Sequence, residues 1–221
     1  MMHKKFIFHP LTVRYSVFML GLAVMGFGIA MMIEANVGVA PWDTLHIGLQ
    51  KTFGLTIGMW SQIMGACIII ASYVIGKIKP TVGMFLNMIF FGLFIDLFMW
   101  LKWVPIGETM IERGVLFAAG LLIYTFGTGM YISPRLGAGP RDSFMLALHE
   151  RMGWGIGKVR IGIECTVTLF GFLLGGPVSV GTLVTALAIG PLIKQFIPLW
   201  ERMMAKPYGK AIWKSTCDQF S

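Results

Sequence analysis

Two short segments of the sequence share a pattern that could take part in substrate binding: a glycine, a proline and then an aspartate. They are Gly38-Val-Ala-Pro41-Trp42-Asp43 and Gly137-Ala-Gly-Pro140-Arg141-Asp142. Proline opens a helix at little cost because its missing N–H would be unpaired there, and an aspartate two residues later suits the positive end of the helix dipole. We therefore expect short helices over Pro41–Phe53 and Pro140–Met152, each followed by a glycine stop.

The aspartates of this motif have two competing interpretations. In the functional one, the two helix amino termini face each other and form a site for a polar or charged substrate, with Asp43 and Asp142 as ligands, gates or proton carriers. In the structural one, glycine and proline shape a tight helix entry and the aspartate caps the helix. Trp42 and Arg141 occupy equivalent positions in the two motifs, so the two half-sites differ.

Other ionisable residues fall inside apolar stretches, where a charge costs roughly 2.5 to 3.5 kcal/mol at the centre of a membrane. Glu164 is the strongest single candidate for function, and its alternative is a helical ion pair with Arg160. Asp96 and its repeat counterpart Lys194 either face the same cavity or reach the membrane interface. The sequence shows no nucleophile triad, metal motif or phosphate-binding loop, so we expect neither enzyme activity nor a cofactor or metal.

The composition explains why such charges would be notable. Among 221 residues, 56% are hydrophobic and only 13% are charged. The apolar residues gather into windows of about twenty, the length with which a helix crosses the hydrocarbon core. The six windows are Tyr15–Ile33, Ile57–Gly76, Thr81–Leu101, Gly114–Ile132, Gly157–Gly175 and Val180–Leu199. Continuous runs without period-two alternation predict an all-α integral membrane protein rather than a barrel.

The sequence also repeats itself. A shift of 99 positions aligns the two aspartate motifs without a gap, and it also places Gly21 on Gly120 and Gly28 on Gly127. After one deletion, a shift of 98 places Gly92 on Gly190. Each copy holds three spans and a re-entrant or interfacial short helix, so the second copy must be inverted in the membrane. We expect a single domain with repeats over 14–101 and 113–199 and a basic tail over 200–221.

The positive charges predict the orientation. Nearly all of them fall on one side if the amino terminus is cytoplasmic, and only Lys51, Lys102 and Arg113 fall on the other. The positive-inside rule therefore places both termini in the cytoplasm of a bacterial cell membrane. This placement accounts for the net charge of +8 without nucleic-acid binding.

The motif Gly38-Val-Ala-Pro-Trp-Asp43, with Leu49, Gly54 and Ile57-Gly58 after it, resembles the YczE/YyaS/YitT family of bacterial multipass membrane proteins, and it looks closest to the YczE branch. The resemblance spans about Arg14 to Leu199 and implies a cytoplasmic-membrane protein for which transport is often suspected. It supplies no substrate and no catalytic residue.

These observations lead to two functional hypotheses. The first is a secondary transporter or exporter of a small molecule, with a site between inverted repeats. The second is a nonenzymatic membrane partner or assembly factor. The expected partners are the lipid bilayer and a small-molecule substrate, and the sequence indicates no oligomeric state.

Overall fold

A computed structural model describes residues 11–105, 107–137 and 139–204, and these residues form helices connected by short turns. The helices are α1 (Leu11–Ala35), α2 (Pro41–Phe53), α3 (Ile57–Gly76), α4 (Val82–Leu101), α5 (Met110–Ile132), α6 (Pro140–Met152), α7 (Ile156–Leu173) and α8 (Val180–Met204). The all-α prediction is confirmed, and both short helices have the predicted bounds. The tail predicted to be cytoplasmic lies outside the described residues from position 205 onward.

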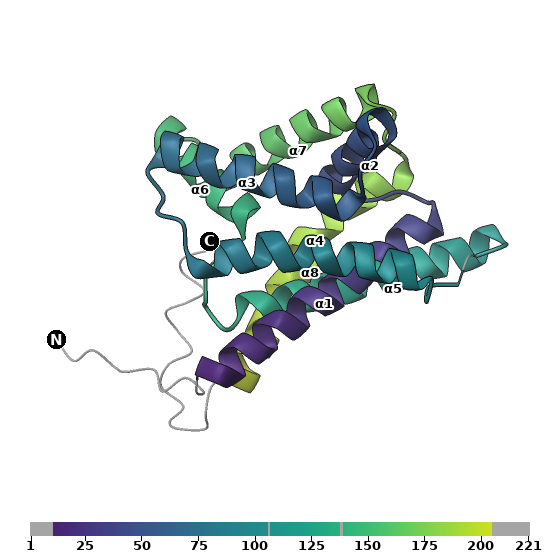
Figure 1. Cartoon of the computed structure of the whole chain (residues 1–221), viewed down its shortest axis with the longest axis horizontal. Helices are drawn as coiled ribbons and strands as arrows, with labels where there is room; N and C mark the ends of the chain where they lie inside the picture. The colour runs from purple at the N-terminus through teal and green to yellow at the C-terminus, as the bar shows by residue number, and fades with distance from the viewer. Residues whose placement is uncertain (1–10, 106, 138, 205–221) are drawn as a thin grey trace.

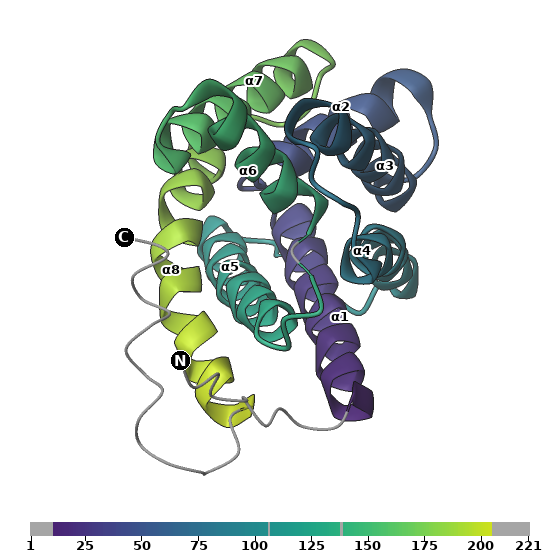
Figure 2. The same ribbon diagram turned by 90° about the vertical axis from the view of Figure 1, so that its left-hand side faces the viewer.

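The helices pack in two layers (Figures 1 and 2). One layer holds α8, α5, α1 and α4 in that order, and the other holds α7, α6, α2 and α3. The long helices α1 and α5 lie at the centre of the first layer and make the most extensive contact in the fold. The short helices α2 and α6 lie at the centre of the second layer, between α3 and α7.

Close helix packing at the centre depends on glycines that the repeat brings into equivalent roles. A methyl group on Gly28 of α1 would lie 2.5 Å from the Tyr124 nitrogen of α5, and one on Gly127 would lie 2.6 Å from the Met25 nitrogen. Gly28 is the repeat counterpart of Gly127, and Met25 is the counterpart of Tyr124. The contacts are therefore reciprocal, as in a twofold interface, and α1 and α5 run antiparallel.

Each short helix packs mainly against a long helix of the other repeat. Helix α2 contacts α7, and α6 contacts α3. Gly48 of α2 fits against the Gly171 carbonyl oxygen, 2.7 Å from a methyl group placed there, and Gly76 of α3 fits at the same distance from the Cα of Ala147 on α6. Residues Pro41–Gly48 of α2 are buried apart from Trp42, whereas the end of the helix is exposed. The amino terminus of α2 therefore points into the protein.

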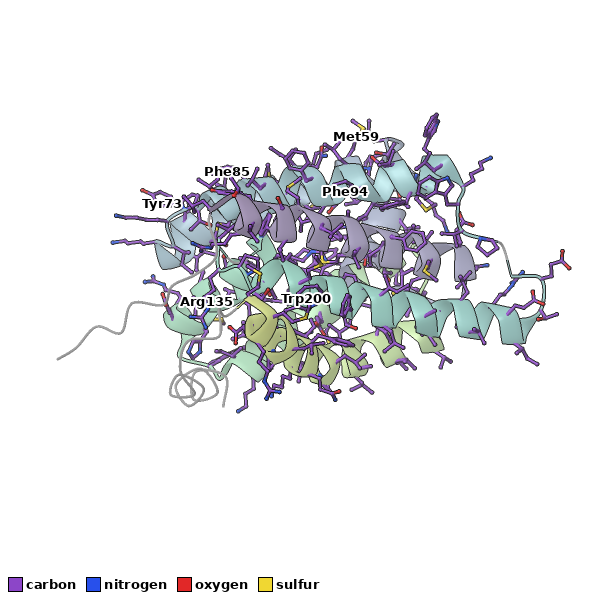
Figure 3. The ribbon with its side chains drawn as sticks, turned by 90° about the horizontal axis from the view of Figure 1, so that it is seen from below. Met59, Tyr73, Phe85, Phe94, Arg135 and Trp200 are labelled. Atoms are coloured by element: carbon purple, nitrogen blue, oxygen red, sulfur yellow. The ribbon has the colours of Figure 1, made fainter. Side chains whose placement is uncertain are left out.

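The outer surface is apolar, as expected of a protein in lipid. Phe85, Ile89, Leu93 and Leu97 form an exposed stripe at four-residue spacing along α4. Figure 3 shows outward-projecting side chains on α3 and α4, Met59, Tyr73 and Phe85 among them. Such a surface is unsuited to water and suited to hydrocarbon.

Five of the described helices are long and apolar enough to cross a membrane: α1, α3, α4, α5 and α8. The predicted span at Gly157–Gly175 corresponds to α7, which is 18 residues long. Helix α7 carries three charged residues, Lys158, Arg160 and Glu164, and is not among these five helices. The sixth span therefore stays a prediction.

Candidate functional site

The amino-terminal half of α2 places two polar side chains in the interior. Asp43 and His46 are 0% and 1% exposed, and their spacing of three residues puts them on one face of the helix. Nδ1 of His46 lies 3.6 Å from Oδ1 of Asp43, beyond hydrogen-bond distance. Among the described residues, neither carboxylate oxygen of Asp43 and neither ring nitrogen of His46 has a hydrogen-bond partner. Asp43 therefore does not cap its helix, and such bare polar atoms in a buried position call for an explanation.

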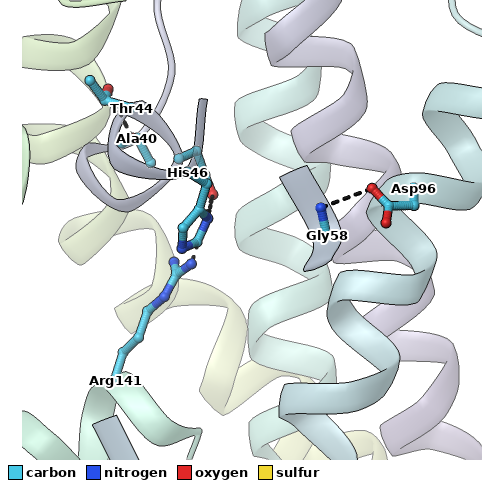
Figure 4. Close-up of polar contacts among 7 residues, drawn as sticks. Ala40, Thr44, His46, Gly58, Asp96 and Arg141 are labelled. Carbon is cyan, nitrogen blue, oxygen red and sulfur yellow. Dashed lines mark hydrogen bonds and ion pairs between the residues drawn. The ribbon is translucent and has the colours of Figure 1, made fainter. Parts of the chain in front are cut away.

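Arg141 supplies the positive charge nearest to Asp43. It lies at the start of α6, and its guanidinium Nη2 is 3.8 Å from Oδ1 of Asp43. Its guanidinium carbon lies 5.1 Å from the centre of the Trp42 ring and 5.9 Å from that of Phe91, both within cation–π range. The Arg141 side chain extends toward His46 (Figure 4) and stays 26% exposed. Trp42 and Arg141, which occupy equivalent positions of the repeated motif, are thus in contact.

Asp142 lies in a different environment from its counterpart Asp43. The Tyr131 hydroxyl donates a hydrogen bond of 3.2 Å to Oδ2 of Asp142. Asp142 is exposed, although Tyr131 is 5% exposed and Asp43 is sealed from solvent. The two aspartates therefore occupy equivalent sequence positions but differ in solvent exposure.

A small cavity of about 20 Å³ adjoins His46 and Arg141, the two residues that lie next to Asp43. Its lining includes His46, Ser61, Asn87, Phe91 and Arg141, contributed by α2, α3, α4 and α6. A volume of this size holds about one water molecule. This conformation leaves room for little more than the side chains already present, so a substrate would require the helices around it to move.

Asp96 performs a task that the sequence interpretation missed. Its Oδ1 accepts a hydrogen bond of 2.8 Å from the backbone nitrogen of Gly58, and its Oδ2 accepts one of 2.5 Å from the Thr56 hydroxyl. Asp96 on α4 thus caps the start of α3 (Figure 4). Next to this cap, a methyl group on Gly58 would lie 2.1 Å from the Gly92 carbonyl oxygen. The start of α3 is therefore held tightly against α4.

The equivalent place in the second repeat is open. Gly157 of α7 corresponds to Gly58, and a methyl group there would meet nothing within 4 Å among the described residues. At Gly190, the counterpart of Gly92, the nearest described atom would be Nη1 of Arg160 at 3.7 Å. Lys194 takes the place of Asp96 and is exposed. Helices α3 and α4 pack closely, whereas α7 and α8 lack a comparable contact.

Glu164 is paired. Its Oε1 accepts a hydrogen bond of 2.9 Å from Nε of Arg160, four residues earlier on α7. This geometry is that of the helical ion pair considered as the alternative to a functional role. The structure thus brings together Asp43, Trp42 and Arg141, keeps Asp142 nearby on α6, and places Glu164 and Asp96 in separate polar contacts.

Two participating residues were absent from the sequence candidates. The four histidines form no ligand pattern, so His46 gives no metal-site signal, although its position three residues after Asp43 in the predicted helix puts both on one face. Tyr131 gave no local signal because it lies on a different long helix, and only the tertiary fold brings it to Asp142.

A chain whose described residues form apolar helices, with an apolar surface and polar side chains gathered inside, is a multipass membrane protein. The chain belongs to the family described as "Family of unknown function (DUF6198)", whose model matches residues 12–198.

Among curated proteins, the chain is 36% identical to "Uncharacterized membrane protein YczE" of Bacillus subtilis over 189 residues, which cover 85% of this chain and 87% of the relative. It is 32% identical to an "Uncharacterized protein" of Haemophilus influenzae, over 88% of each chain. It is 25% identical to "Uncharacterized protein YyaS" of Bacillus subtilis, over 86% of this chain and 94% of the relative. These matches confirm the resemblance to YczE and YyaS. No solved structure gives a significant match.

Proposed function

We propose that the protein is a secondary transporter of a small molecule, built from two inverted repeats of three spans with α2 and α6 as re-entrant helices. The observation that carries this proposal is the meeting of Asp43 and Arg141, each from the start of a short helix, in the interior between the repeats. Inverted-repeat transporters bind their substrates near the membrane midplane at such helix starts. The antiparallel, reciprocal contacts of α1 and α5 support the inverted arrangement.

The difference between the two repeats supports alternating access. Gly58 and Gly92 are in close contact between α3 and α4, whereas their repeat counterparts Gly157 and Gly190 are apart between α7 and α8. With both termini cytoplasmic, the closed contact of Gly58 with Gly92 lies toward the outside and the open pair Gly157 and Gly190 lies toward the cytoplasm. In this assignment the conformation faces inward. The outward-facing state would exchange the roles of the two pairs.

The exposure of the aspartates agrees with this assignment. Asp142 is exposed and Asp43 is 0% exposed, so solvent reaches one half of the site and not the other. In an alternating mechanism the second state would bury Asp142 and open Asp43. The Asp96 cap would then have to break, because it joins the two helices that must separate.

Flux measurements in proteoliposomes test the proposal. Purified wild type and Asp43→Asn would be compared across a panel of small cations, anions and neutral solutes, with Glu150→Gln as the control because Glu150 is an exposed acid near the end of α6. We expect flux of at least one solute in wild type and the control, and its loss in Asp43→Asn. If the folded wild-type protein moves no solute, transport is rejected in favour of a nonenzymatic membrane partner.

A further inference from the structure

The environment of the Arg141 guanidinium indicates what kind of substrate the site would take. We propose that the site binds a small organic cation of the guanidinium or primary-amine type, and that the Arg141 side chain occupies its place in this conformation. This inference rests on the proposed transport function for its physiological meaning. It rests on the geometry of the site for its chemistry.

The first step is the charge at the bottom of the site. Asp43 is 0% exposed, and neither of its carboxylate oxygens accepts a hydrogen bond from the described residues. A buried ionised carboxylate without donors is costly, and a cation that supplies N–H groups would remove that cost. Arg141 stays 3.8 Å away, too far for a hydrogen bond. The carboxylate is therefore still able to bind a better-placed donor.

The second step is the aromatic wall. Trp42 and Phe91 lie 5.1 and 5.9 Å from the guanidinium carbon, and their electron-rich faces attract cations and not anions. Oxygen and nitrogen acceptors complete the lining, because Ser61, Asn87 and His46 border the adjoining cavity. A carboxylate, aromatic faces and neutral acceptors together form a receptor for a cation with several N–H groups.

The third step is that Arg141 is able to leave. Its side chain is 26% exposed, whereas that of Asp43 is completely buried, so the guanidinium lies between solvent and the carboxylate. Its withdrawal would add the volume of one guanidinium to the cavity of about 20 Å³. The other guanidinium nearby, that of Arg160, is engaged by Glu164 at 2.9 Å. A substrate cation would thus replace Arg141 at Asp43 without competition from Arg160.

The charge count agrees with a cationic substrate. Apart from the Arg160–Glu164 pair, the site holds the carboxylates of Asp43 and Asp142 and the single guanidinium of Arg141. The site therefore holds two acidic side chains and one guanidinium. A cation that replaces Arg141 would restore the charge balance of this conformation, whereas an anion would add to the charge of the acidic side chains, which the low dielectric of the interior opposes.

The test uses the full-length protein with guanidinium chloride and methylammonium chloride as probes and sodium acetate and sodium phosphate as anionic comparisons. Calorimetry in detergent would measure binding, and solid-supported-membrane recordings from proteoliposomes would measure the sign of the current. We expect both cations, and neither anion, to bind wild type and Arg151→Gln, an exposed arginine on the same helix. Arg141→Gln should bind guanidinium at least about fivefold more tightly, because the tethered competitor is gone.

Trp42→Leu should weaken guanidinium binding about 5- to 30-fold, as expected for the loss of one cation–π contact. Asp43→Asn should abolish it, with size-exclusion profiles confirming that each variant folds. Binding of the anions alone, or weaker cation binding in Arg141→Gln, would overturn the inference and leave the transport proposal intact. Cation binding with no flux of any solute would uphold the site and reject transport.

Discussion

The Asp96 cap allows a direct test of the proposed alternation between closed and open repeats. Asp96→Ala removes the acceptor of two hydrogen bonds, one from the Gly58 backbone nitrogen and one from the Thr56 hydroxyl. Hydrogen bonds to a charged group contribute roughly 1.5 to 3 kcal/mol when buried, and because Asp96 is half-exposed we take about 1 kcal/mol for each. The closed contact between α3 and α4 should lose about 2 kcal/mol, equivalent to a shift of about 30-fold toward the open state.

A reporter cysteine measures this shift. Ser61 on α3 is 7% exposed and lines the central cavity, so Ser61→Cys should be protected while α3 and α4 are closed. In a background with Cys67, Cys165 and Cys217 replaced by serine, a membrane-impermeant thiol reagent added from the outside should label it about 30-fold faster in Asp96→Ala. Labelling follows the open population when opening is fast compared with the reaction.

Lys194→Ala is the matched control, since Lys194 is the repeat counterpart of Asp96 and its side chain is exposed. It should leave the labelling rate within about twofold of the parent. Equal rates for the two variants, with thermal unfolding showing both to be folded, would refute the assignment of Asp96 to a conformational cap.

Three further predictions follow from the packing and the charges. Gly28→Leu should destabilise the detergent-solubilised protein by several kcal/mol in thermal unfolding, because even a methyl group would lie 2.5 Å from the Tyr124 nitrogen. Gly162→Ala should instead be neutral or slightly stabilising, since no described atom lies within 4 Å and alanine is the better helix former. Glu164→Gln should lower the free energy of unfolding by about 0 to 1 kcal/mol, as expected for a half-exposed ion pair. Solute flux should stay within about threefold of wild type, and loss of flux would instead give Glu164 a direct role in transport. A reporter enzyme that works only in the cytoplasm should be active when fused to either terminus. Activity of a periplasm-specific reporter at either terminus would contradict the orientation.

The local features of the fold were predictable from the sequence because they depend on a few backbone-determining residues. Proline at positions 41 and 140 and glycine at positions 54 and 153 predicted the two short helices with the bounds that the structure shows. The long apolar windows likewise predicted the five helices that are able to span a membrane. These signals need no knowledge of which helix packs on which.

The site itself required the tertiary structure. Sequence identified Asp43 and Arg141 as candidates, but their contact depends on how α2 and α6 meet inside the fold, which no local spacing encodes. The cap formed by Asp96 joins the start of α3 to α4 between residues 38 positions apart in the sequence, a separation with no fixed local pattern. The sequence also gives no sign that the two repeats pack differently. Aligned positions such as Gly58 and Gly157 are both glycine, yet the first is tightly packed and the second is open.

Each short helix packs mainly against a long helix of the other repeat, and this has a consequence for biosynthesis. The Thr44 hydroxyl on α2 donates a hydrogen bond to the carbonyl oxygen of Pro177, 133 residues further along the chain. At 5 to 20 residues per second, a ribosome needs roughly 7 to 27 seconds to synthesise that interval. During this time α2 lacks α7, the helix of the other repeat against which it mainly packs. A chain truncated before α7 would therefore be a natural substrate for membrane quality control.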